Sequence, residues 1–466
     1  MQADATALAR DIATGRLTAT AAMEASLDAA ERFAALGAIA FCDPVKGMAA
    51  AAAFDALSGA GKAVPFGGVP TLAKDLGGPF EGFPVSAGSK MLPRRGGMAD
   101  SDLAMRFRAA GFCMFGLTTS PEFGLSLASE PAIGPLSRNP LDPGLSSGGS
   151  SGGAAAAVAA GIVSIAHATD AGGSIRVPAA CCGLVGLKPG RGTMPGGPGF
   201  GNHLGGIATE LAICRSVRDA ARAFTALSGN ARGPYPPSAV TPLPETGMRI
   251  GLLLDTGNET PTDADRTDAV EAAARALEAH GHTIHLLRHD DIAGMAQASA
   301  RAFADVVAIN LAETAERLSA DFSAAEPMTQ AVLAYGRTLS GTAAWRLMNA
   351  MVFVSRDLWR LFDNIDCLLT PMISGAPKPI GSFPTDHDDI ALHFQRMQAF
   401  APMAALANIS GFPAITLPFG ADTSGLPLPL QIIAPMGAEP ILLALAATLE
   451  SEERWRHPFP VAGLVS

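Results

Sequence analysis

Cysteine is scarce in this chain. Its 466 residues include only six cysteines, and their positions lack the paired spacing of metal-binding motifs. Two of them, Cys181 and Cys182, are adjacent, and a disulfide between neighbours would be strained. This pattern excludes a disulfide-stabilised scaffold and is typical of reduced core thiols in a cytoplasmic protein.

An excess of basic residues is also missing. The 33 Lys and Arg residues are outnumbered by 43 Asp and Glu residues, which gives a net charge of −10. Such a chain is poorly suited to bind nucleic acid or an anionic membrane surface. No apolar run is long enough to span a bilayer, and the first residues lack the charged-then-apolar pattern of a secretory signal. We therefore expect no nucleic-acid partner, no membrane partner and a cytoplasmic location.

Linkers are absent as well, since no long Pro/Ser-rich stretch or run of charge divides the sequence. Apolar residues make up 48% of the chain, enough to bury a large core. Segments with helical and strand periodicity alternate, as in α/β folds whose sheet is buried on both faces. We predict one α/β domain over residues 1–466, with helices on both faces of a continuous sheet.

Histidine clusters at one place, without a recognised metal pattern. The cluster consists of His280, His282, His285 and His289. No carboxylate or thiolate completes a known zinc spacing there. Residues 283–287 alternate polar and apolar side chains, and we interpret them as a strand leading to the surface. We predict no metal and no cofactor.

The sequence does contain two motifs in which glycines flank serine. Residues 148–153 read Gly-Gly-Ser-Ser-Gly-Gly, and residues 170–178 read Asp-Ala-Gly-Gly-Ser-Ile-Arg-Val-Pro, with an alanine-rich segment between them. Glycine lets backbone N–H groups approach a bound group closely, as an anion cradle or oxyanion hole requires. A phosphate-binding loop fits poorly because no Lys follows the glycines. A purely structural role for these turns remains the alternative.

These motifs resemble those of the amidase signature family of serine hydrolases. Both glycine-serine motifs match, with the family's spacing between Ser150 and Ser174, and residues 68–75 match the motif that carries the family's lysine, Lys74. The resemblance reaches to about residue 455 and implies a mixed central sheet, with a signature core at residues 65–225. Three loops are most similar to the branch that contains 6-aminohexanoate cyclic-dimer hydrolase, namely residues 129–135, 179–184 and 205–208.

The resemblance implies a catalytic triad of Lys74, Ser150 and Ser174. A serine hydroxyl is a weak nucleophile until a base takes its proton. Lys74 can act as that base only when uncharged, and burial among apolar neighbours would lower its pKa toward neutrality. In the family, Ser150 lies on a cis peptide bond and relays the proton, while Ser174 attacks the amide and forms an acyl-enzyme. The implied oxyanion donors are the backbone N–H groups of Ala171, Gly172, Gly173 and Ser174.

Other polar residues of the motifs are interpreted as supports. Charged residues near a dry site are usually paired, so we expect Asp170 to accept hydrogen bonds from loop amides and Arg176 to have a buried partner. Ser147 and Ser151 could tune hydrogen bonding or cap the following helix, and we favour capping.

The predicted function is hydrolysis of a small linear or cyclic amide, with release of ammonia or an amine. The alternative is the amidase (glutaminase) subunit of a tRNA-dependent amidotransferase, which shares the triad but needs a partner chain. The absence of a basic face weighs against it, and the intact motifs weigh against an inactive binding protein. The resemblance is also compatible with a homodimer.

Specificity is expected from residues 295–362, which are predicted to be helical. The resemblance implies that this region covers the mouth of the site, with simple core packing as the alternative. Relatives often carry an asparagine where this chain has Thr119. Other local predictions are two helices within 3–36, a strand ending at Lys74, a helix at 102–110, strands at 112–117 and 249–254, a helix at 263–280, and closing strands at 366–371, 408–417 and 426–434.

Overall fold

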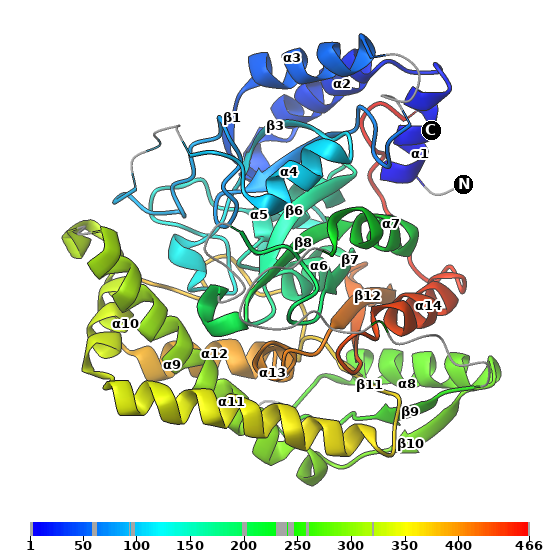
Figure 1. Ribbon diagram of the computed structural model, residues 1–466. Helices are drawn as coiled ribbons and strands as arrows, with labels where there is room; N and C mark the ends of the chain where they lie inside the picture. Colours follow the sequence, from blue (N-terminus) through cyan, green and yellow to red (C-terminus); the bar gives the residue numbers. More distant parts are fainter. Residues whose placement is uncertain are drawn as a thin grey trace.

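A mixed sheet of eight strands lies at the centre of the structure (Figure 1). The structure is a computed structural model, which describes residues 3–57, 63–92, 94, 98–197, 203–229, 240, 247–257, 261–318 and 321–464. The strand order is β10-β9-β11-β13-β12-β7-β8-β6, in which β9 is parallel to β10 and β11 and the other pairs are antiparallel. The strands are β6 (Ile165–Asp170), β7 (Val185–Lys188), β8 (Thr209–Cys214), β9 (Arg249–Leu252), β10 (Thr283–Leu286), β11 (Cys367–Pro371), β12 (Ala414–Ala421) and β13 (Pro427–Ile433). The predicted α/β class and mixed sheet are confirmed.

A smaller sheet carries Lys74. Its strands are β1 (Ile39–Cys42), β2 (Pro70–Lys74) and β3 (Cys113–Thr118), in the order β1-β3-β2. The prediction of one continuous sheet is therefore wrong for this part of the chain. Strand β2 faces β6 through side chains, because Thr71 Oγ1 donates to the carbonyl of Ile165 and the amide of Lys74 donates to the ring of His167. Lys74 nevertheless stands at a strand end, as predicted.

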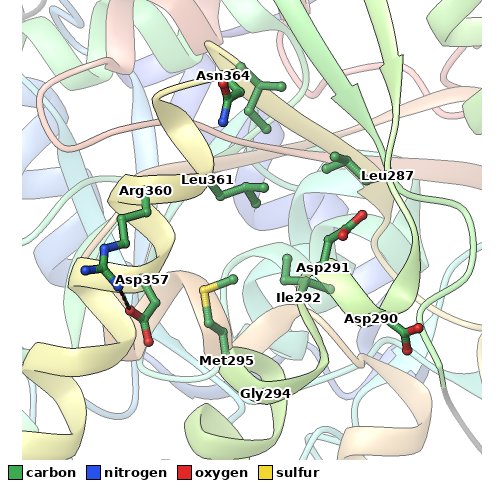
Figure 2. A pocket seen from close by; sticks show the side chains of 11 residues that line it. Leu287, Asp290, Asp291, Ile292, Gly294, Met295, Asp357, Arg360, Leu361 and Asn364 are labelled. Carbon is green, nitrogen blue, oxygen red and sulfur yellow. Dashed lines mark hydrogen bonds and ion pairs between the residues drawn. The ribbon is translucent and has the colours of Figure 1, made fainter.

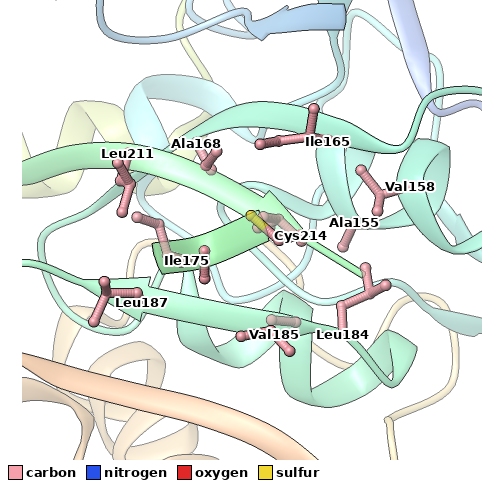
Figure 3. Close-up of a cluster of buried hydrophobic side chains, with 14 of the residues drawn as sticks. Ala155, Val158, Ile165, Ala168, Ile175, Leu184, Val185, Leu187, Leu211 and Cys214 are labelled. Atoms are coloured by element: carbon pink, nitrogen blue, oxygen red, sulfur yellow. The ribbon is translucent and has the colours of Figure 1, made fainter. Parts of the chain in front are cut away.

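Helix α5 (Gly152–Ala159) is completely buried and contacts strands of both sheets. Figure 3 shows its Ala155 and Val158 beside Ile165 of β6. No side chain fits at Gly153, since a Cβ added there would lie 2.3 Å from the amide nitrogen of Thr119. The alanine-rich segment between the two serine motifs is therefore a core helix followed by a buried strand.

Helices cover both faces of the large sheet. Helices α7 (Val217–Leu227), α14 (Glu439–Glu450) and α8 (Ala264–Ala279) contact one another in that order and pack on β8, β12, β13 and β11. Helix α6 (Arg176–Cys182) packs on β7, β12 and β13.

Two N-terminal helices, α2 (Ala19–Arg32) and α3 (Pro44–Asp55), pack on the smaller sheet, whereas α1 (Ala5–Ala13) contacts α7. Helix α4 (Asp102–Ala109) connects β2 to the parallel strand β3. Asp4 and Thr18 cap the first two helices with their side chains, which confirms the predicted two-helix start.

The predicted helical region is also confirmed. It contains α9 (Ala293–Leu318), α10 (Pro327–Thr338) and α11 (Gly341–Phe362), which Figure 1 shows on the lower left together with α12 (Ile390–Phe400) and α13 (Ala404–Ser410). Helix α13 corrects the predicted strand at 408–417, whose first residues are helical. Gly411 ends this helix with a φ of 82°, and the strand β12 starts only at Ala414.

The remaining described elements are short. They are the hairpin β4 (Arg138–Asn139) and β5 (Asp142–Ser146) and the 3-10 helices η1 (Ala34–Leu36), η3 (Glu122–Gly124), η4 (His203–Gly206), η5 (His289–Asp291) and η6 (Phe322–Ala324). Among the described residues, no helix combines the length and apolarity needed to cross a membrane.

Candidate active site

Lys74 is fully buried at the end of β2. Its Nζ is 2.7 Å from Ser150 Oγ and 2.8 Å from Thr169 Oγ1. Burial disfavours the charged amine and lowers the pKa of Lys74 to about 7, although the carboxylates of Asp170 and Glu210 act in the opposite direction. A lysine with this pKa is partly uncharged near neutral pH, as a general base must be.

The two serine motifs meet beside this amine. Ser150 follows a cis peptide bond from Gly149, and its Oγ contacts Lys74. Ser174, in the loop between β6 and α6, accepts a hydrogen bond of 3.3 Å on its carbonyl from the amide of Ser151. Lys74 is 0% exposed and Ser150 2%, whereas Ser174 is 8% exposed. Of the three, Ser174 is therefore the one most accessible to a substrate.

The loop 171–174 presents backbone amides next to Ser174. The amide of Gly173 donates to Asp170 Oδ1 at 2.8 Å, which takes Gly173 out of the predicted set of four oxyanion donors. Within the described part of the chain, the amides of Ala171, Gly172 and Ser174 have no hydrogen-bond partner. Three of the four predicted donors therefore remain available to an oxyanion.

Packing shapes the same loop from the helical region. A Cβ added at Gly172 would lie 2.6 Å from the ring of Phe303, on α9. A side chain at position 172 would therefore require the ring of Phe303 to move, and this close approach brings α9 next to the loop.

Asp170 and Arg176 form a buried ion pair under the loop, and both are 0% exposed. Arg176 Nε donates to Asp170 Oδ2 at 2.9 Å and its Nη2 to Oδ1 at 3.0 Å. Asp170 also accepts from the amide of Ile175 at 3.1 Å and from Asn408 Nδ2 at 2.9 Å. Although burial alone would raise the pKa of Asp170, the guanidinium of Arg176 holds that pKa well below its usual range. The pair fastens the loop to helices α6 and α13.

We expect Asp170→Asn to lower the free energy of unfolding by about 3–5 kcal/mol at pH 7, because it leaves the guanidinium of Arg176 buried without a countercharge. The folded-state pKa of Asp170 is depressed, so its contribution is fully present above the unfolded pKa of about 3.9 and is lost as the pH falls through the folded-state value. Urea unfolding at pH 7 measures the change. The exposed Asp265→Asn is the matched control, expected within about 0.5 kcal/mol of wild type. Equal stability of the two variants would contradict this role of the pair.

Ser151 does not cap helix α5, and the capping prediction is wrong. It occupies the N-cap position, but its hydroxyl donates to the carbonyl of Thr169 at 3.2 Å and accepts from the amide of Thr169 at 3.3 Å. The amide of Gly152 donates instead to Ser129 Oγ at 2.9 Å. Ser147 likewise does not cap, since its hydroxyl donates to Ser137. Ser151 therefore joins the first serine loop to β6.

Sequence reasoning missed two neighbours of Lys74, Thr169 and His167. Both are on β6, two residues apart, and both contact the lysine. The two-residue alternation of a strand was the signal that could have placed them on one face. Thr119, by contrast, is buried, and its hydroxyl donates a hydrogen bond to the carbonyl of Gly37. Among the described residues, Thr119 therefore has a structural role.

A separate pocket of about 600 Å³ lies where the end of α11 meets η5 and the start of α9 (Figure 2). Its lining includes Leu287, Asp291, Met295, Arg360 and Asn364. Lys74, Ser150 and Ser174 are not among the lining residues, so this pocket is not part of the site described above.

Comparison with known proteins gives one consistent answer. Residues 21–443 match the family model described as Amidase. The putative amidase AmiC of Mycobacterium tuberculosis (strain ATCC 25618 / H37Rv) is 32% identical over 466 residues, covering 97% of this chain and 95% of the relative. The 6-aminohexanoate-cyclic-dimer hydrolase of Pseudomonas sp. (strain NK87) is 30% identical over 421 residues, covering 84% of each.

Comparison with solved structures indicates the same family. The structure of 6-aminohexanoate cyclic dimer hydrolase matches with a TM-score of 0.89 at 28% identity and covers 98% of each chain. A chain of the glutamyl-tRNA(Gln) amidotransferase from Thermotoga maritima matches with a TM-score of 0.66 at 25% identity, covering 86% of this protein and 87% of that chain. The predicted family and branch are confirmed, and the amidotransferase alternative corresponds to a more distant neighbour.

Proposed function

The chain belongs to the amidase family and is an amidohydrolase of carbon–nitrogen bonds, and we propose that it cleaves a small amide through Lys74, Ser150 and Ser174. The observation that carries this proposal is the 2.7 Å contact between the buried amine of Lys74 and the hydroxyl of Ser150. An uncharged amine has two N–H groups and one lone pair. Donation of one N–H to Thr169 Oγ1 leaves the lone pair able to face Ser150.

Nucleophilic attack follows from this arrangement. Lys74 takes the proton of Ser150, Ser150 takes the proton of Ser174, and Ser174 Oγ attacks the amide carbonyl carbon. The backbone amides of Ala171, Gly172 and Ser174 hold the tetrahedral oxyanion, and each such donor is worth about 3 kcal/mol of the barrier. The C–N bond breaks as the proton returns through Ser150 to the leaving nitrogen. Water then hydrolyses the acyl-enzyme by the same route.

The substrate class is proposed from the neighbourhood of the loop. Phe303 of α9 packs against Gly172, so the region 295–362 brings an apolar ring next to the loop that carries Ser174. We propose that this region selects a linear or cyclic amide with an apolar chain next to the carbonyl. The amide cleaved by the relative named 6-aminohexanoate-cyclic-dimer hydrolase is one member of the panel to test. A cytoplasmic location and a homodimer remain predictions.

Labelling of Ser174 tests the proposed nucleophile. A fluorophosphonate phosphonylates an activated serine with loss of fluoride, and the peptide that carries Ser174 is expected to gain the label stoichiometrically, as mapped by mass spectrometry. Acid-denatured protein is the control and is expected to remain unlabelled, because reactivity depends on the folded site. A label on a different serine would overturn the assignment. Release of ammonia or amine from amides of increasing acyl length would then rank the substrates.

A further inference from the structure

Two side chains on one face of β6 bind Lys74, one at its Nζ and the other at its backbone amide. Its Nζ donates to Thr169 Oγ1, and its backbone amide donates to His167 Nδ1 at 3.2 Å. A ring nitrogen that accepts this bond carries no proton, so His167 is neutral and its proton is on Nε2. The ring is 0% exposed and packs edge-on against Phe80 and Phe107, with centroid distances of 5.0 Å and 5.6 Å. A buried histidine is therefore oriented to hold the main chain of the lysine.

Glu210 of β8 completes the contact. In the pairing of β6 with β8, Glu210 lies opposite Thr169 and diagonally from His167, which places the three side chains on one face of the sheet. His167 Nε2 donates to Glu210 Oε2 at 3.2 Å, and Glu210 Oε1 accepts from the amide of Gly78 at 3.4 Å. A carboxylate thus joins the histidine to the segment that follows Lys74.

The segment that follows Lys74 packs closely against Glu210. Gly77 has a φ of 89°, and a Cβ added there would lie 2.6 Å from Glu210 Oε1 and 2.8 Å from Thr169 Cγ2. The chain therefore passes Glu210 with no room for a side chain. The backbone of Lys74 and that of Gly78 are tied to the same carboxylate, one through the imidazole and one directly.

We propose that His167 and Glu210 are positioning residues for the base of the reaction. They hold the backbone of Lys74 in place, so that its Nζ stays within hydrogen-bond distance of Ser150 Oγ. This inference rests on the proposed function, because it assigns the pair a task only if Lys74 is the base. Neither side chain touches the reacting atoms. Because a catalytic group displaced by about 1 Å can lose about 100-fold in rate, holding the backbone is a measurable contribution.

The charged and titratable groups that face Lys74 come from three elements. They are Asp170 and His167 on β6, Glu210 on β8, and the adjacent Asp75, which pairs with Arg94. Asp170 is bound to Arg176 and Asp75 to Arg94, so replacing either of these carboxylates would break an ion pair with arginine. The side chain of Glu210 is 17% exposed, whereas that of His167 is fully buried.

Two variants of His167 separate backbone positioning from core packing. His167→Leu removes the acceptor for the amide of Lys74, and kcat is expected to fall about 100-fold with KM nearly unchanged. His167→Asn offers an oxygen near the position of Nδ1 and is expected to recover kcat to within about tenfold of wild type. Urea unfolding of both variants shows whether each is folded at the assay temperature.

Glu210→Gln keeps the shape but removes the charge. The acidic limb of the kcat/KM profile is expected to move to lower pH, because the negative charge that favours protonated Lys74 is gone. Glu439→Gln is the matched control. Glu439 is buried and, like Glu210, accepts a hydrogen bond from a glycine amide, that of Gly190. We expect the acidic limb of the Glu439→Gln profile to stay at the wild-type pH.

The outcomes distinguish this inference from the proposed function. Loss of activity in a Lys74 variant, together with wild-type kcat in His167→Leu or an unmoved limb in Glu210→Gln, would overturn the positioning role alone. Full activity in a Lys74 variant would overturn the proposed base and, with it, this inference. Recovery in His167→Asn together with a moved limb in Glu210→Gln supports both.

Discussion

Ser174→Ala is expected to reduce kcat for amide hydrolysis by about a million-fold, to a rate set by the oxyanion donors alone. Without Oγ at position 174 no acyl-enzyme forms. The backbone amides at 171, 172 and 174 still polarise the carbonyl, so some acceleration over water remains. Steady-state release of amine, measured at enzyme concentrations high enough to detect a slow residual rate, gives the size of the loss.

Substrate binding is expected to persist in Ser174→Ala, because the substitution removes only the hydroxyl oxygen of this residue. Substrate is expected to bind Ser174→Ala with a Kd close to the KM of wild type if chemistry is slow relative to dissociation. Calorimetric titration measures it, and the fluorophosphonate label should disappear. Ser164→Ala is the matched control, since Ser164 is buried and its hydroxyl has no hydrogen-bond partner in the described structure. A Ser174→Ala enzyme that keeps even one thousandth of the activity would contradict nucleophilic attack by this residue.

Local sequence patterns predicted the elements of this fold better than their assembly. The strand that ends at Lys74 and the buried helix after Ser150 follow from apolar periodicity and small side chains, and both are present. The division into two sheets did not follow, because β2 meets β6 through a threonine hydroxyl and a histidine ring instead of a backbone ladder. Periodicity shows that a strand is buried but does not show which neighbour it pairs with.

The same distinction applies to the candidate site, whose reacting residues were predicted from the sequence and whose supporting residues were not. The motifs named Lys74, Ser150 and Ser174, and the structure brings the two serine loops and the lysine together. The groups that hold them are distant in sequence, as Asn408 under the loop and Glu210 behind His167 show. The hydroxyl of Ser151 is a local example. Its N-cap position was predictable, but its bond to Thr169 depends on how close β6 comes to the helix start.

Lys74→Met is expected to lower kcat by at least about ten-thousand-fold while raising stability at neutral pH. The activity falls because no other uncharged base contacts Ser150 among the described residues. In wild type, Lys74 must be deprotonated, so kcat/KM should fall as the pH drops below about 7 and level off above it. In Lys74→Met this limb should vanish. Activity profiles from pH 5 to 9 test both statements, and a variant that retained the limb would show that another group is the base.

The stability change has the opposite sign because burial of the amine is costly. The pKa of Lys74 is about 7 in the folded protein against an ordinary value near 10.5, so between these values the unfolded chain binds more protons than the folded one. Wild-type stability should therefore rise with pH across this range, and the advantage of Lys74→Met, a few kcal/mol at pH 7, should shrink toward pH 10. The orphaned hydroxyls of Ser150 and Thr169 reduce the gain by about 1–3 kcal/mol. Urea unfolding at pH 7 and pH 10 measures the trend. A stability difference independent of pH would mean that Lys74 is charged in the folded enzyme, and a charged amine cannot take the proton of Ser150.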